Sequence, residues 1–132
     1  MIIEIDNLVK RYGDFLALNH FNLQVREGEV LGLLGPNGSG KSTAINCMLS
    51  LLSFDKGTIK LFGNKMTPTS YEIKQKIGVV PQDIAVFEEL TVYDNVDYFC
   101  GLYVADKKKR KLLIEEVISL VGLEEFKGFY PK

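Results

Sequence analysis

The stretch "GLLGPNGSGKST", residues 32–43, combines small, turn-forming residues with a single lysine. Its spacing matches G-x-x-x-x-G-K-[ST], a pattern in which backbone N–H groups cradle phosphates. In such a loop the lysine reaches the β- and γ-phosphates and the hydroxyl after it holds magnesium. The pattern therefore predicts a phosphate-binding loop made of Gly35, Pro36, Asn37, Gly38, Ser39, Gly40, Lys41, Ser42 and Thr43.

A phosphate loop needs a strand before it and a helix after it, and the flanking sequence predicts both. Residues 30–34 form a continuous apolar run, typical of a strand buried on both faces of a parallel sheet. Residues 44–52 carry apolar side chains at helical spacing. A dinucleotide-binding fingerprint fits less well, because Thr43 stands where that pattern needs Gly or Ala.

Further strands are predicted in the first two-thirds of the chain. Alternation of apolar and polar residues over 21–25 predicts a half-buried strand, and a turn at 27–29 joins it to 30–34 as a hairpin. Apolar residues also predict strands near 3–5 and 59–61. In addition, residues 77–80 read as a short buried strand that stops at a proline.

Helices are predicted in the last third. Thr91, with Asp94 three residues later, is typical of a helix N-cap. Asp106 is expected to cap a second helix, which Gly122 closes. The loop over 81–90 is the expected seam between the strand-rich and helical parts.

Composition sets loose limits on function. The chain has 132 residues, about one domain, with a net charge of −1 and no apolar run as long as a membrane span. The basic run 107–111 could contact nucleic acid or anionic lipid, but a solvated helix start is the expectation because basic excess and interleaved aromatic residues are missing. Cys47 and Cys100 have no partner at metal-ligand spacing and read as apolar fillers.

Two further motifs make the whole chain resemble the ATP-binding subunits of ABC transporters. "LVKRYGDFLAL" resembles the A-loop of that family, in which the aromatic residue matching Tyr12 stacks on adenine. "IGVVPQD" resembles the Q-loop, in which the glutamine matching Gln82 contacts magnesium and senses the membrane partner. Among subfamilies, the chain most resembles exporter ATPases that pair with separate permeases.

The resemblance implies an α/β fold, that of a P-loop NTPase of the ABC ATPase type. Residues 1–90 would form the ATP-binding core with A-loop, Walker A and Q-loop, joining an antiparallel β subdomain to a partial α/β core. Residues 91–132 would begin an incomplete helical subdomain. The implied ligands are ATP and Mg²⁺, with Lys41 and Gln82 as catalytic residues and Ser42 and Gln82 at the metal.

The implied function is to couple ATP binding and hydrolysis to transport through a separate transmembrane permease. Two ATP-binding subunits, alike or different, would work as a pair at the cytoplasmic face of the membrane, without nucleic acid. A non-transport ABC-type ATPase and another P-loop enzyme are the alternatives. A GTPase is disfavoured because GTPases resemble one another in an N-K-x-D motif that recognises the base. Here Asn64 and Lys65 are followed by Met66 and Thr67, so the aspartate is missing.

The family's remaining catalytic parts have no match in this sequence. They are an apolar strand ending in Asp, a following Glu, a downstream His and an LSGGQ-like segment, whereas the single histidine, His20, precedes the phosphate loop. We therefore expect this chain to bind ATP without efficient turnover and to be the N-terminal part of a longer protein, cut inside the helical subdomain. Its unpaired strand edges predict marginal stability and association.

Overall fold

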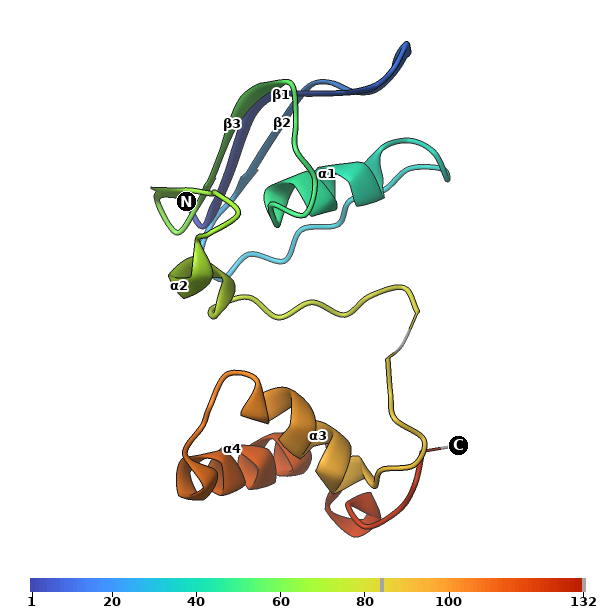
Figure 1. The fold of residues 1–132 in the computed structure, drawn as a ribbon, viewed down its shortest axis with the longest axis vertical. Helices are drawn as coiled ribbons and strands as arrows, with labels where there is room; N and C mark the ends of the chain where they lie inside the picture. The colour runs from blue at the N-terminus through green and yellow to red at the C-terminus, as the bar shows by residue number, and fades with distance from the viewer. Residues whose placement is uncertain (84, 132) are drawn as a thin grey trace. The chain divides into compact units, whose positions relative to one another are not determined.

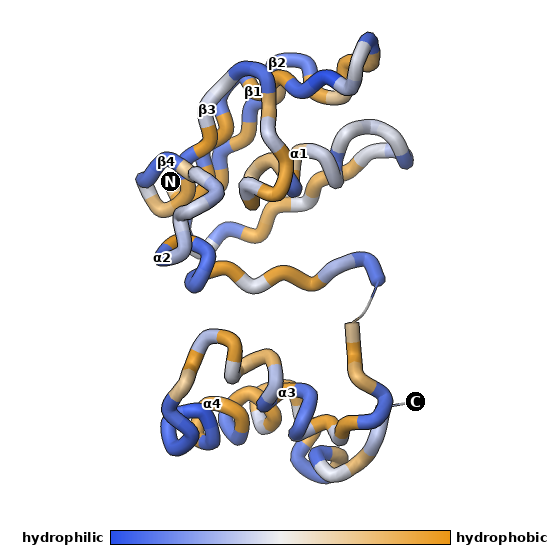
Figure 2. Tube along the Cα trace, in the orientation of Figure 1, coloured by the Kyte–Doolittle hydropathy of each residue, from blue (hydrophilic) through white to orange (hydrophobic). Residues whose placement is uncertain are grey.

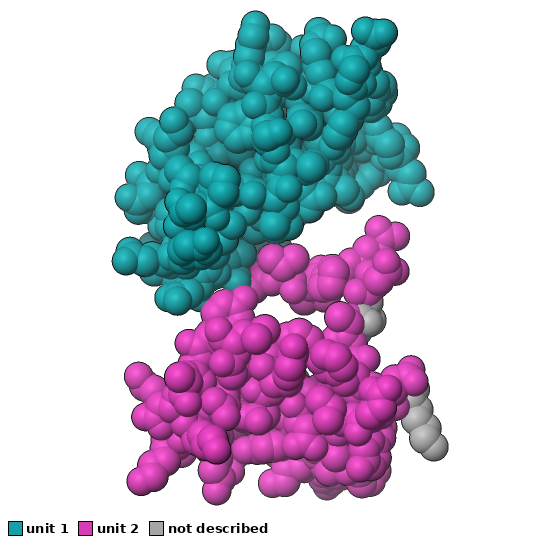
Figure 3. All heavy atoms as spheres, in the orientation of Figure 1, with its two compact units in different colours: residues 1–77 teal, residues 78–132 magenta. Residues whose placement is uncertain are grey.

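The computed structural model describes residues 1–83 and 85–131. The chain divides into two compact units, Met1–Ile77 and Gly78–Lys132, coloured separately in Figure 3. This division lies ahead of the 81–90 loop that we expected as the seam. The assignment of functions to residues 1–90 and 91–132 remains a prediction.

The first unit is built around an antiparallel sheet (Figure 1). Its strands are β1 (Ile3–Tyr12), β2 (Phe15–Val25), β3 (Lys56–Leu61) and β4 (Asn64–Lys65), in the order β2-β1-β3-β4. The strands expected near 3–5, 21–25 and 59–61 are confirmed, and each is longer than its apolar core. Gly57 makes the close pairing of β3 with β1 possible, since a Cβ there would lie 2.6 Å from the Asn7 carbonyl oxygen.

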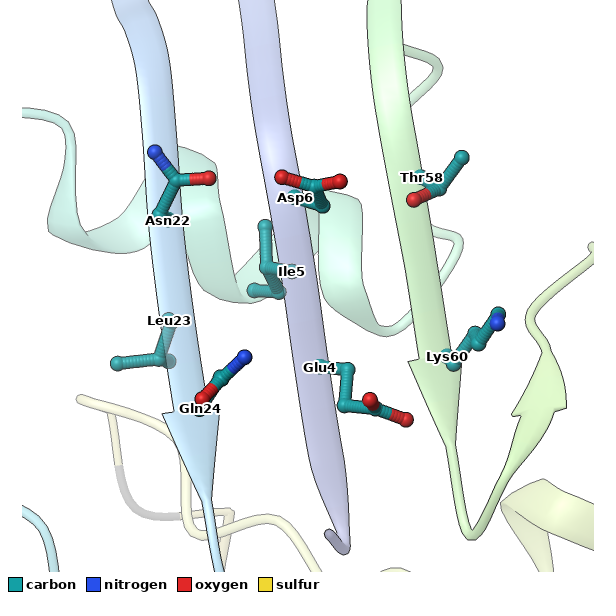
Figure 4. A pocket seen from close by; sticks show the side chains of 8 residues that line it. All are labelled: Glu4, Ile5, Asp6, Asn22, Leu23, Gln24, Thr58 and Lys60. Atoms are coloured by element: carbon teal, nitrogen blue, oxygen red, sulfur yellow. The ribbon is translucent and has the colours of Figure 1, made fainter.

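The core lies between one face of this sheet and helix α1 (Lys41–Met48). Its buried side chains come from β1, β2, β3 and α1, with one more beyond β4: Ile5, Leu8, Leu18, Ala44, Cys47, Ile59, Leu61 and Met66. Because side chains alternate along a strand, the opposite face is polar. A concavity of about 490 Å³ lies on that face, and Figure 4 shows the side chains that line it, among them Glu4, Asp6 and Lys60.

The predicted strand over residues 30–34 is not formed, and the predicted hairpin with 21–25 is wrong: β2 pairs with β1 instead. Within the described residues, no strand lies beside 30–34, so its backbone lacks the partner that a strand requires. Within this apolar run, orange in Figure 2, Val30 is 99% exposed and Leu34 is 93% exposed. Between it, the sheet and α1 lies an apolar hollow of about 310 Å³.

Residues 77–80 also form no strand, contrary to expectation, and Val79 and Val80 are exposed. The reason is the same, since no described strand pairs with them. Before them lies the short helix α2 (Tyr71–Lys74), which follows a turn in which Ser70 Oγ accepts the Thr67 N–H at 3.0 Å.

The second unit is helical, with α3 (Val92–Gly101), α4 (Lys107–Leu120) and the 3₁₀ turn η1 (Glu124–Phe126). Both predicted N-caps are confirmed: Thr91 accepts the Asp94 N–H, and Asp106 accepts those of Lys108 and Lys109. Gly122, at φ 71°, is the left-handed residue after α4. Ile114 and Ile118 are the buried residues of α4.

Two side chains of the second unit, Asn95 and Arg110, make polar contacts that join its segments. Asn95, only 7% exposed, accepts the Phe87 N–H at 2.8 Å and donates to the carbonyls of Phe87, Leu90 and Thr91. It therefore ties the segment before α3 to the helix. Arg110 of α4 pairs with Asp97 of α3 at 2.6 Å, which ties the two helices together.

Candidate functional site

The predicted phosphate loop leads directly into α1. Its turn closes by a hydrogen bond from the Ser39 N–H to the Pro36 carbonyl at 3.1 Å. Gly38 and Gly40 have φ values of 83° and 99°, which L side chains rarely adopt. Gly40 is the N-cap of α1 and supplies no side-chain cap, so the first N–H groups of the helix remain available to an anion.

Gly40 fixes the loop against the sheet. A Cβ at this position would lie 2.8 Å from the Ala17 carbonyl oxygen of β2 and 3.0 Å from Leu18 Cδ2. At the other end of the loop, a Cβ on Gly35 would meet Ser39 Oγ at 2.6 Å. At Gly40 the obstacle is a backbone atom, so close packing requires glycine there, whereas at Gly35 the obstacle is a serine hydroxyl that can rotate away.

Lys41 places a cation at the loop. Its Nζ donates to the Gly35 carbonyl, to the Pro36 carbonyl at 2.9 Å and to Ser39 Oγ at 3.4 Å. The ammonium group thus takes part in the loop's own hydrogen bonding, and it can exchange a carbonyl partner for a phosphate oxygen. Ser42, in the first turn of α1, is exposed.

Tyr12 ends β1 at the tip of the β1–β2 hairpin, and its side chain is 46% exposed. The Lys10 ammonium lies 5.1 Å from the centroid of the Tyr12 ring, a cation–π contact. The Asp55 carboxylate accepts the Arg11 N–H at 2.8 Å and so fixes the backbone just before Tyr12. Sequence reasoning missed Lys10 and Asp55. Only the periodicity of β1 could have indicated Lys10, and no local signal pointed to Asp55.

Gln82 belongs to the second unit, in an exposed stretch outside helix and strand. Its part at a metal therefore remains a prediction. His20 lies in β2 with φ 51° and is exposed. Among residues 1–83 and 85–131, no group of three or more His, Cys, Asp or Glu side chains could hold a metal ion.

The two cysteines are free thiols. Cys47 is fully enclosed in the core, as expected of an apolar filler. Burial raises the pKa of its thiol, while the nearby Lys10 ammonium acts in the opposite direction. A raised pKa keeps the thiol protonated and unreactive at neutral pH. Cys100 is only partly buried.

A glycine-rich turn that opens the first helix beside a sheet, with a lysine next to it, is the arrangement of a P-loop, a motif typical of nucleotide-binding proteins. The family model described as "ABC transporter" matches residues 18–131. The chain belongs to this family.

Curated relatives agree with this assignment. The chain is 39% identical over 131 residues to the probable sulfate/thiosulfate import ATP-binding protein CysA of Chlorella vulgaris, covering 99% of the chain and 55% of the relative. It is 36% identical over 124 residues to the linearmycin resistance ATP-binding protein LnrL of Bacillus subtilis, covering 94% and 40%. The chain thus spans about half, or less, of these relatives' length.

Solved structures establish the fold. The structure of cbiO1 from Clostridium perfringens, described as part of an ABC transporter complex, matches with a TM-score of 0.87 at 24% identity, covering 98% of this chain and 53% of that one. The ATP-binding cassette MJ0796, dimeric and bound to ADP and Pi, matches at 0.75 and 26% identity, covering 98% and 61%. The predicted fold class, an α/β P-loop NTPase of the ABC ATPase type, is confirmed. Within the part that the structure describes, no helix is long and apolar enough to cross a membrane.

Proposed function

We propose that the chain forms the nucleotide-binding part of an ABC transporter ATP-binding subunit. One observation carries the proposal: Gly40 seats the loop on β2 and opens α1, with the Lys41 ammonium beside the loop carbonyls. This cradle fits a triphosphate, because backbone N–H groups, the positive end of the helix and a cation converge on it. The family membership supports the same conclusion.

The residues divide the work by the chemistry they carry. The loop N–H groups and Lys41 hold the β- and γ-phosphates and neutralise charge that develops on the transferred phosphoryl group. Tyr12 offers an exposed aromatic face to adenine. Ser42 and Gln82 would hold Mg²⁺, and the ion would supply positive charge that stabilises the negative charge of the phosphates.

The activity proposed for the whole protein is ATP hydrolysis coupled to transport through a separate permease, at the cytoplasmic face of the membrane. Two ATP-binding subunits would act together, an arrangement supported by the dimeric cassette among the structural relatives. This chain alone would bind ATP with little turnover.

The test is a calorimetric titration of the chain with Mg-ATP, with phosphate release followed in the same cell. We expect Lys41→Ala to weaken binding by about tenfold or more, because it removes a charge-assisted contact to phosphate. Lys107→Ala, which removes an exposed lysine from the second unit, is the control and should bind like the parent chain. Equal binding by the parent chain and Lys41→Ala would refute the proposal.

A further inference from the structure

A second aromatic side chain stands opposite Tyr12. Phe15 begins β2 and pairs directly with Tyr12 across the turn formed by Gly13 and Asp14. Directly opposed residues of an antiparallel pair project from the same face, with their Cβ atoms about 5 Å apart. Tyr12 is 46% and Phe15 60% exposed, so both rings are accessible to a ligand.

The face that carries these rings is the one covered by α1. Along β1, Leu8, Lys10 and Tyr12 are spaced two apart and project to the same side. Leu8 is a core residue packed with α1. The Lys10 ammonium is near enough to Cys47 of α1 to influence its thiol, and it also lies over the Tyr12 ring.

A bulge in β2 brings Phe15 to that face. Leu18 is buried in the core, but the pairing with β1 shifts between Leu18 and Leu16, which leaves Ala17 as an extra residue in β2. An extra residue reverses the alternation of side chains. Phe15, and not Leu16, therefore continues on the face of Leu18.

The same bulge touches the phosphate loop. The Ala17 carbonyl oxygen is the atom that a Cβ on Gly40 would meet at 2.8 Å. Phe15 lies two residues from Ala17 toward the hairpin turn, which corresponds to about 7 Å at the rise per residue of a strand. That distance leaves room for a ribose between a phosphate held by the loop and a base at the hairpin tip.

We propose that Phe15 contacts the nucleotide base together with Tyr12 and helps to determine specificity for it, an inference that rests on the proposed function. The ligand class is a purine nucleoside triphosphate, since two aromatic side chains on one face favour the larger ring system. Phe15 supplies apolar and π contact only, so its contribution depends on the base and not on the phosphates.

The experiment compares ATP, CTP and inorganic tripolyphosphate as ligands of the chain by calorimetry. Phe15→Ala should weaken ATP binding about tenfold, the size expected for loss of one aromatic–base contact, and should weaken CTP binding less. Tripolyphosphate, which has no base, should bind unchanged. Phe15→Tyr should restore ATP binding, and Leu16→Ala, next to Phe15 but on the other face, should leave it unchanged.

The outcomes separate the two proposals. Unchanged ATP binding by Phe15→Ala, with binding still lost in Lys41→Ala, would overturn the role of Phe15 and leave the proposed function standing. Equal weakening of ATP and tripolyphosphate would also overturn it, because the substitution would then act through the loop. If the parent chain bound neither ATP nor tripolyphosphate, both the proposed function and the role of Phe15 would be refuted.

Discussion

At the scale of single residues, the phosphate loop contains two glycines, Gly38 and Gly40, that are subject to different structural constraints. Gly38 and Gly40 both adopt a left-handed φ. A Cβ on Gly38 would enter open space, whereas one on Gly40 would meet the Ala17 carbonyl oxygen at 2.8 Å. Backbone strain is therefore shared by the two positions, while the steric constraint belongs to Gly40 alone.

This contrast predicts unequal costs of substitution. We expect Gly38→Ala to lower the free energy of unfolding of the first unit by about 1–2 kcal/mol, the cost of a side chain in the left-handed region. Gly40→Ala should lower it by about 2–4 kcal/mol, since β2 and the loop must also separate. Urea denaturation of both variants measures the difference, and equal losses would contradict the steric argument.

At the scale of elements, Asn95 couples α3 to the segment before it. One buried amide serves the Phe87 N–H and three carbonyl groups. Such a network is strong only while every member is present, because removing the shared partner leaves several backbone groups without one.

We expect Asn95→Ala to destabilise the second unit by about 2–3 kcal/mol, because it leaves buried groups unpaired. The Phe87 amide should then exchange its hydrogen with solvent faster. Asn64→Ala is the matched control, since Asn64 is exposed and makes a single bond to the Phe62 carbonyl, at 3.0 Å. Slow exchange at Phe87 in the Asn95→Ala variant would show that the amide does not hold the segment.

Elements with local signals were predicted well. The caps at Thr91 and Asp106 depend on a few neighbouring residues, and so does the glycine loop before α1. The strands expected at 30–34 and 77–80 failed, because apolar runs report a tendency to be buried while a strand also needs a pairing partner. The bulge at Ala17 depends on the register between β1 and β2, and the Asp55 contact joins residues 44 positions apart; periodicity encodes neither of them.

At the scale of the whole chain, the apolar run at 30–34 is the feature that we expect to promote self-association. Val30 is 99% exposed, the run has no neighbouring strand among the described residues, and an apolar hollow lies beside it. Unpaired, apolar backbone of this kind invites pairing with a second chain. Marginal stability and self-association therefore remain our prediction.

Light scattering during size-exclusion chromatography tests the association. We expect the chain to associate as its concentration rises and Val30→Lys to reduce that association, because an edge lysine opposes strand addition. Leu120→Lys, at an exposed position on α4, is the control and should leave the association unchanged. A monomer with a sharp, reversible two-state melt would contradict the prediction.

The bulge at Ala17 has a consequence for how this hairpin evolves. Deleting Ala17 would restore regular pairing and leave Phe15 opposite Tyr12 on the same face, but it would remove the carbonyl oxygen that lies against Gly40. The length of β2 at this point therefore affects how the phosphate loop is seated more than the direction in which Phe15 projects. Across lineages, we expect loss of the extra residue in β2 to accompany a change in the loop, even where the residue types at the hairpin tip are kept.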